Sequence, residues 1–188
     1  MKPAFWRIAF LFIAVLGASV AGAEDNPGKV SPAERMRIDC YPIDTIHWQA
    51  AVALDNASLL AAMTLPLSWG HGDAPYLIDS ATYGDTRLEY FALKTYLVDT
   101  AQQNVLIGLI SDLGMGLPPL EPGNGPIVLL HFTRTARTSH PLKLDSTFIP
   151  PHNTLQLVTP DVRAITPQLE IRLTDQTAAA FKPDAEDR

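Results

Sequence analysis

The sequence contains a single cysteine, Cys40, among 188 residues. One thiol cannot close an internal disulfide, so the hydrophobic core must stabilise the fold by itself. The chain is long enough for one domain with a sizeable core. Because free cysteine usually behaves as a small hydrophobe, we expect Cys40 to be half-buried, and a disulfide to another chain is the alternative.

Charged side chains are also scarce, at 18% against 47% hydrophobic residues, which predicts a packed globule rather than a disordered chain. The formal net charge is −6. A surface of that sign repels nucleic acids and anionic lipid headgroups, so we expect neither as a partner. The 16 prolines are scattered along the chain, which favours many short strands and argues against long helices.

One long apolar run is present, at the start of the chain. Lys2 and Arg7 are followed by the apolar stretch Ile8–Val20, and small residues then lead to Ala23 and Glu24. This order is typical of a secretory signal peptide cleaved between Ala23 and Glu24. An uncleaved anchor is the alternative, although a membrane span needs about 20 apolar residues. We therefore expect an exported protein, periplasmic or secreted, with no membrane span after signal removal.

The clearest strand pattern lies in the middle of the chain. Val105–Ile110 and Ile127–Thr133 are apolar stretches joined by a loop rich in proline and glycine, which cannot sustain a helix. In the second stretch Val128, Leu130 and Phe132 share one face. Two such strands are not stable alone and require a facing sheet, so the pattern predicts a layered all-β domain.

Further apolar stretches predict the remaining strands of an antiparallel β-sandwich of about nine strands. These stretches are Ile46–Leu54, Leu59–Trp69, Tyr76–Ile78, Arg87–Phe91, Lys94–Val98, Leu142–Phe148, Leu155–Val158 and Ile165–Leu173. Pro66 predicts that its strand lies at a sheet edge or carries a bulge, because proline cannot donate to the ladder. A helix over Ala57–Met63 is the alternative there. The expected division is a signal peptide at 1–23, a flexible lead-in at 24–36, the sandwich at 37–174 and a disordered tail at 175–188.

Three segments of the sequence resemble bacterial cohesin-type modules. They are Asp44–Trp48, Asn56–Trp69 and the Gly-x-Gly turn with its strand at Gly123–Phe132. The sequence departs from the pattern at Ile43, where a glycine is usual, and at Gly70, where an aspartate often follows the aromatic residue. The resemblance implies a jelly-roll β-sandwich related to some carbohydrate-binding modules.

Catalytic and metal-binding motifs are weak in this sequence. It contains neither a Gly-x-Ser-x-Gly nor a His-Glu-x-x-His motif. Ser68, His71 and Asp73 are close in sequence, but that spacing places no nucleophile against a base. His71 and Asp73, with Asp79 or Asp85, offer metal-ligating atoms, although glycine and aspartate here are also ordinary turn residues. We expect no enzyme, no metal site and no cofactor.

Binding residues are predicted only weakly. Tyr76 and Tyr83 lie in Gly70–Gly84, a stretch that is expected to be loop-like around the short segment Tyr76–Ile78, and both are candidates for stacking on a sugar. Met115 and Leu117 lie in the Pro/Gly loop, which either folds over the end of the sandwich or exposes an apolar patch for a partner. We therefore expect a non-catalytic exported binding module for a protein partner. The alternative is a carbohydrate-binding module that recognises an extracytoplasmic polysaccharide.

Overall fold

The computed structural model of the protein describes residues 30–138 and 140–173, and within these ranges the secondary structure is entirely β. The strands are β1 (Val30–Pro42), β2 (His47–Asn56), β3 (Ala62–Ser68), β4 (Tyr76–Thr82), β5 (Leu93–Asp99), β6 (Asn104–Ile110), β7 (Gly123–Arg134), β8 (Asp145–Ser146), β9 (Gln156–Val158) and β10 (Ala164–Leu173). The predicted all-β class is confirmed.

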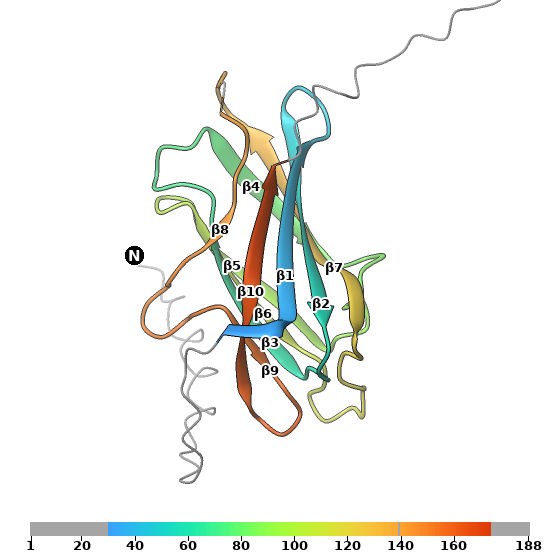
Figure 1. Cartoon of the computed structure of the whole chain (residues 1–188). Coiled ribbons are helices and arrows are strands. Elements are labelled where there is room, and N and C mark those ends of the chain that lie inside the picture. Colours follow the sequence, from blue (N-terminus) through green and yellow to red (C-terminus); the bar gives the residue numbers. More distant parts are fainter. Residues whose placement is uncertain (1–29, 139, 174–188) are drawn as a thin grey trace, which may run out of the picture.

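The strands form two facing layers (Figure 1). The first layer has the order β4-β7-β2-β1-β10, and the second has the order β9-β3-β6-β5 with β8 beside β3. Strand β10 belongs to both layers, because Ala164 and Ile165 pair with β9 while the following residues run parallel to β1. The sandwich is therefore closed along one side by β10, and β4 and β5 are the free edges of the two layers.

The core lies between the layers, and the alternation along the strands builds it. Val105, Ile107 and Leu109 of β6 are buried, as the period of two predicts. The predicted face of β7 is confirmed, since the Val128, Leu130 and Phe132 side chains are fully buried. The Trp69 and Phe132 rings meet edge to face with 5.5 Å between their centroids.

Cys40 faces this core and is buried, which leaves it inaccessible for a disulfide to another chain. Burial raises the pKa of the Cys40 thiol to about 11. A thiol that stays protonated at neutral pH behaves as an inert apolar side chain, as the sequence prediction of a small hydrophobe implied.

The expected flexible lead-in at 24–36 is wrong for its second half, because β1 begins at Val30. Strand β1 pairs with β2 on one side and with β10 on the other, so it lies inside the first layer. This segment looked polar in the sequence because the charged residue Glu34 interrupts the alternation of apolar residues that is typical of a strand. Its carboxylate is buried and accepts hydrogen bonds from the Ala57 and Ser58 backbone N–H groups, both at 3.1 Å.

Of the other predicted strands, one is wrong and one is wrong in part. Arg87–Phe91 forms turns, in which the Arg87 side chain rather than a ladder satisfies neighbouring carbonyl groups. Leu142–Phe148 contains only the short strand β8, although Leu142 and Leu144 are buried as expected. The predicted short strand Tyr76–Ile78 extends to Thr82 as β4.

Pro66 does not mark a sheet edge, because β3 lies between β6 and the pair β8 and β9. The Thr147 N–H donates to the Pro66 carbonyl at 3.0 Å, so the carbonyl points toward β8 and β9. The N–H that proline lacks would point the same way, into the gap between the last β9 partner and the first β8 partner. A central strand therefore tolerates this proline without losing a ladder hydrogen bond.

Several expectations lie outside the described residues, namely the signal peptide at 1–23 with its cleavage site at Ala23 and Glu24, and the tail at 175–188. Among the residues that the structure does describe, no helix is long and apolar enough to cross a membrane.

Candidate functional site

The outer face of the β9-β3-β6-β5 layer is the most unusual surface of the sandwich. Residues directly opposite each other in a sheet project from the same face, and the buried residues of β3 and β6 define the inner one. The outward residues therefore form four rows across the strands. The rows are Val158, Ala62, Ile110 and Leu93; Gln156, Thr64, Gly108 and Thr95; Pro66, Leu106 and Leu97; and Asp145, Ser68, Asn104 and Asp99.

The first three rows contain no ionisable side chain. Leu97 is 64% exposed, while Leu93, Leu106 and Ile110 are partly exposed around it. The two carboxylates, Asp99 and Asp145, are confined to the last row. We call these four rows the neutral face.

Gly108 lies at the centre of the neutral face, where no side chain projects from the sheet. A Cβ atom at this position would lie 3.3 Å from the Cγ2 atom of Thr95, which is a tight contact. The absence of a side chain at Gly108 leaves a shallow step between the apolar rows that contain Ile110 and Leu106.

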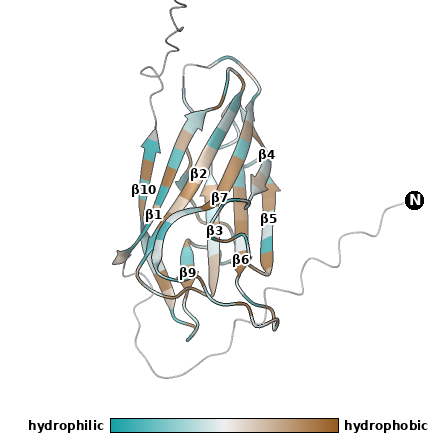
Figure 2. Ribbon diagram, turned by 90° about the vertical axis from the view of Figure 1, so that its right-hand side faces the viewer, coloured by the Kyte–Doolittle hydropathy of each residue, from teal (hydrophilic) through white to brown (hydrophobic). Residues whose placement is uncertain are grey.

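The outer face of the opposite layer has a different chemistry. Arg37 and Asp39 form an ion pair at 2.7 Å on β1, and Arg172 and Glu170 form another at 2.7 Å on β10. The hydrogen bond from Arg172 holds the pKa of Glu170 below its usual range. In Figure 2, β1 and β10 accordingly alternate between hydrophilic and hydrophobic bands. This charged ladder is suited to contact with water.

The expectation that Tyr76 is an exposed loop residue is wrong. Tyr76 lies at the start of β4 with 2% of its surface exposed, and its hydroxyl donates to the His140 carbonyl at 2.9 Å. Its ring meets Trp48 edge to face, so it packs in the core. Tyr83 is half-buried, and burial raises the pKa of its hydroxyl to about 12. Neither ring offers a broad flat face to a sugar.

Some apolar residues of the loop between β6 and β7 pack on the end of the sandwich and others are exposed, so each of the two predicted outcomes holds for part of the loop. Leu120 is buried and Leu117 is half-buried, so part of the loop packs on the end of the sandwich. Met115 is 65% exposed, and Leu113 is exposed beside it. The Asp112 carboxylate accepts a hydrogen bond from the Met115 N–H at 2.7 Å, which gives this tip a defined shape. Met115 is thus available to a partner, whereas Leu117 is only partly so.

The residues weighed for catalysis or metal binding have local structural roles or lie in solvent. The Ser68 hydroxyl donates to the Gly70 carbonyl at 2.7 Å, and His71 and Asp73 are exposed. The loop around them is held by Gln103, whose side-chain oxygen accepts from the Gly72 N–H at 3.0 Å. Over residues 30–138 and 140–173, no group of three His, Cys, Asp or Glu side chains gathers as a metal site would require.

The sequence predicted the strands of the neutral face, but it did not identify this face as a candidate site. The signal was present in Val105–Ile110, a stretch that is apolar on both faces although only one face is needed for the core. Leu97 likewise belongs to a predicted strand with apolar neighbours. A sheet that is apolar on both sides indicates that its outer side is covered by something.

The sequence matches no known family profile and no curated protein. The structure, in contrast, resembles solved cohesin domains. The cohesin of a complex named Coh-OlpA-Doc918, from Clostridium thermocellum, shares 12% identity with a TM-score of 0.57, over 76% of this chain and 99% of that one. The seventh ScaB type I cohesin of Pseudobacteroides cellulosolvens shares 12% identity with a TM-score of 0.53, over 82% and 97% of the two chains.

A type II cohesin domain from the cellulosome of Acetivibrio cellulolyticus shares 8% identity with a TM-score of 0.54, over 75% of this chain and 92% of that one. At these identities the likeness concerns the fold. The chain folds as a jelly-roll β-sandwich. More particularly, it is a cohesin-like sandwich, as the three sequence segments predicted.

Proposed function

We propose that this protein is a non-catalytic binding module that docks a protein partner on the neutral face. The observation that carries the proposal is the contrast between the two outer faces. The centre of a protein–protein interface is depleted of charged residues, and apolar side chains are concentrated there. The neutral face has that composition around Leu97 and Leu106, whereas the opposite face carries the ion pairs of β1 and β10.

The cohesin domains that this fold resembles include several solved as complexes with dockerins. A dockerin-type module encoded in the same genome is therefore the first partner to test. The proposal does not depend on that identity, because the exposed Leu97 and the partly exposed Leu106 and Ile110 fit any protein partner that presents a complementary apolar surface.

Recognition of an extracytoplasmic polysaccharide is the second candidate function. Sugar-binding faces present aromatic rings, because rings stack on the apolar sides of sugars. None of the outward residues of the neutral face is aromatic. This composition favours a protein partner, and an array of polysaccharides checks the choice. If the protein is retained on a polysaccharide and no protein partner is found, polysaccharide recognition becomes the favoured function and protein docking the second candidate.

A matched pair of arginine variants tests the docking proposal. Leu97→Arg places a charge on the neutral face, and Leu77→Arg places one on the outer face of β4, where Leu77 is 45% exposed. Proteins retained from the envelope and medium of the source organism are purified and titrated against each variant. We expect Leu97→Arg to weaken binding by about tenfold or more, since it buries an unpaired charge. Equal affinities for both variants would contradict the proposal.

We also propose that the protein is exported through its N-terminal segment. The apolar run at Ile8–Val20 and the small residues before Glu24 support this proposal. The mature protein is then expected to begin at Glu24, which mass spectrometry of the protein isolated from its native host determines. A mature chain that retains residues 1–23 would contradict cleavage at this site.

A further inference from the structure

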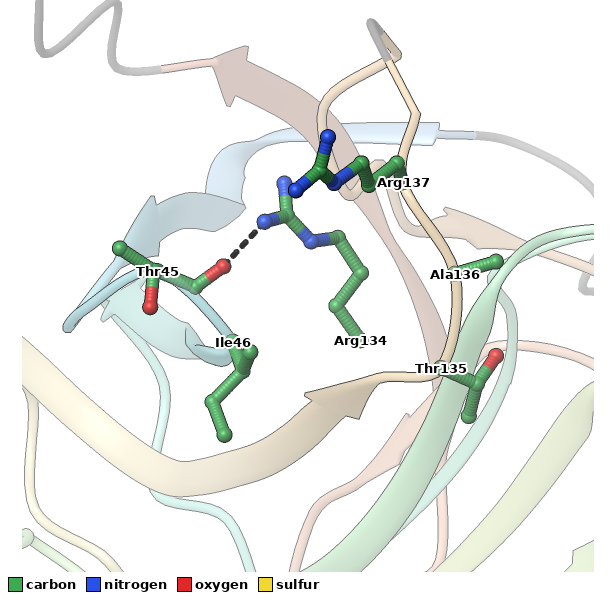
Figure 3. A pocket seen from close by; sticks show the side chains of 6 residues that line it. All are labelled: Thr45, Ile46, Arg134, Thr135, Ala136 and Arg137. Atoms are coloured by element: carbon green, nitrogen blue, oxygen red, sulfur yellow. Dashed lines mark hydrogen bonds between the residues drawn. The ribbon is translucent and has the colours of Figure 1, made fainter.

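A second feature lies away from the neutral face, at the end of the sandwich where β7 leaves the first layer. A pocket of about 360 Å³ is open to solvent there, between the turn that joins β1 to β2 and the segment that follows β7. Figure 3 shows its lining, and two arginine side chains dominate it. The lining residues are Thr45, Ile46, Arg134, Thr135, Ala136 and Arg137.

These two arginines differ from the other arginines in the described part of the chain. Four of those others, Arg35, Arg37, Arg163 and Arg172, form ion pairs with carboxylates. Arg87 donates to four oxygen atoms of the protein. Arg134 instead donates to one carbonyl, that of Thr45, and Arg137 has no hydrogen bond or ion pair to any described residue. Most of the donors of both guanidinium groups are therefore free.

The carboxylate nearest in sequence forms no hydrogen bond or ion pair with either arginine. Asp44 precedes Thr45, but its oxygens accept from the Ile46 N–H at 2.8 Å and face the His47 ring at 2.7 Å. The hydrogen bonds from His47 and from the turn hold the pKa of Asp44 at about 2. Asp44 is thus committed to its own turn, and two positive charges line one pocket of a protein whose net charge is −6.

We propose that this arginine pocket binds a carboxylate group presented by an acidic peptide segment. A guanidinium group matches the two oxygens of a carboxylate through parallel hydrogen bonds. In Figure 3 both guanidinium groups turn toward the Thr45 side of the pocket, and the proposed carboxylate binds on that side. Ile46, which is exposed, and Ala136 are the apolar residues of the lining, and either can contact the aliphatic part of a glutamate or aspartate.

Half of the backbone donors in the pocket are occupied, which favours a carboxylate over a phosphate. Phosphate sites commonly use several free backbone N–H groups, which surround the tetrahedral anion. Here the Arg134 N–H donates to the Ile46 carbonyl at 2.7 Å, and the Thr135 N–H donates to the Pro75 carbonyl at 2.9 Å. The Ile46 N–H is likewise taken, by Asp44, so three of the six lining residues offer no backbone donor. The guanidinium forks, whose geometry suits a planar two-oxygen anion, are the strongest donors of the pocket.

A nuclear magnetic resonance titration of the full protein tests the site. The probe is a peptide of four glutamates with both ends blocked, and the same peptide with four glutamines is the reference. We expect only the glutamate peptide to shift the backbone resonances of Thr45, Ile46 and Ala136. A glutamate peptide that shifts none of these resonances at millimolar concentration, or shifts those near Arg163 equally, would overturn the proposal.

Three variants make the test specific. Arg137→Gln leaves every described hydrogen bond intact and is expected to weaken peptide binding by about tenfold, because it removes one charged fork. Arg137→Lys keeps the charge without the fork and is expected to bind with intermediate affinity. Arg163→Gln removes an arginine outside the pocket and should bind as the wild type does. Equal binding by Arg137→Gln and the wild type, or inorganic phosphate binding as tightly as the peptide, would contradict a carboxylate site.

Discussion

At the scale of single residues, Glu34 is the side chain on which the local structure depends most. Its carboxylate is 1% exposed and accepts three hydrogen bonds from the turn between β2 and β3. The shortest, 2.6 Å, comes from the Ser58 hydroxyl. A buried carboxylate that is fully hydrogen-bonded in this way joins β1 to a turn that is distant in sequence.

We predict that Glu34→Gln lowers the free energy of unfolding by about 2 kcal/mol, because hydrogen bonds to a charged acceptor are lost and an amide N–H₂ faces backbone N–H donors. Urea denaturation measures the change. Glu89→Gln is the matched control, since Glu89 is exposed and its side chain makes no hydrogen bond to a described residue. If the two variants have equal stability, the role assigned to Glu34 is wrong.

At the scale of elements, the turn after β4 is organised by Arg87. Its guanidinium group donates to the Leu54 carbonyl at 3.0 Å, to the Asn56 side chain at 2.8 Å and to the Gly123 carbonyl at 2.9 Å. It also donates to the Glu121 carbonyl at 2.6 Å. Gly123 has a φ of 154°, and a Cβ atom there would lie 3.1 Å from the guanidinium group. One side chain thus connects the end of β2 to the start of β7.

We predict that Arg87→Lys lowers the free energy of unfolding by roughly 2 to 4 kcal/mol, because one ammonium group cannot satisfy acceptors on both sides of a planar fork. Thermal unfolding followed by circular dichroism measures the change. Arg163→Lys should alter stability by less than about 0.5 kcal/mol, since the Arg163–Asp161 pair is exposed. A loss at Arg87 as small as that at Arg163 would show that the turn holds its shape without this side chain.

At the scale of the whole molecule, the sequence predicts the layers better than it predicts their edges and surfaces. The apolar stretches Val105–Ile110 and Ile127–Thr133, separated by a loop rich in proline and glycine, were sufficient to predict two strands and a facing layer. Strand β1 was missed because Glu34 is a buried charge whose partners lie more than 20 residues away. Tyr76 was misplaced because its core position depends on contact with Trp48. Contacts distant in sequence leave no local pattern.

The two proposed binding surfaces illustrate the same limit. The neutral face arises from the register of four strands, so its rows exist only once β3, β5, β6 and β9 are aligned. The arginine pocket combines Arg134 and Arg137 with the turn at Thr45, about 90 residues earlier. Each residue taken alone is an ordinary surface residue. Their chemistry follows from the fold, which brings the neutral and charged outer faces onto opposite sides of one molecule.

Hydrogen–deuterium exchange of the protein with and without its purified partner tests the central claim most directly. The account predicts that partner binding slows exchange in β5 and β6 and leaves β1, β2 and β10 unchanged, because the partner covers the neutral face and not the charged one. Slowed exchange confined to β1, β2 and β10, with β5 and β6 unaffected, would contradict it.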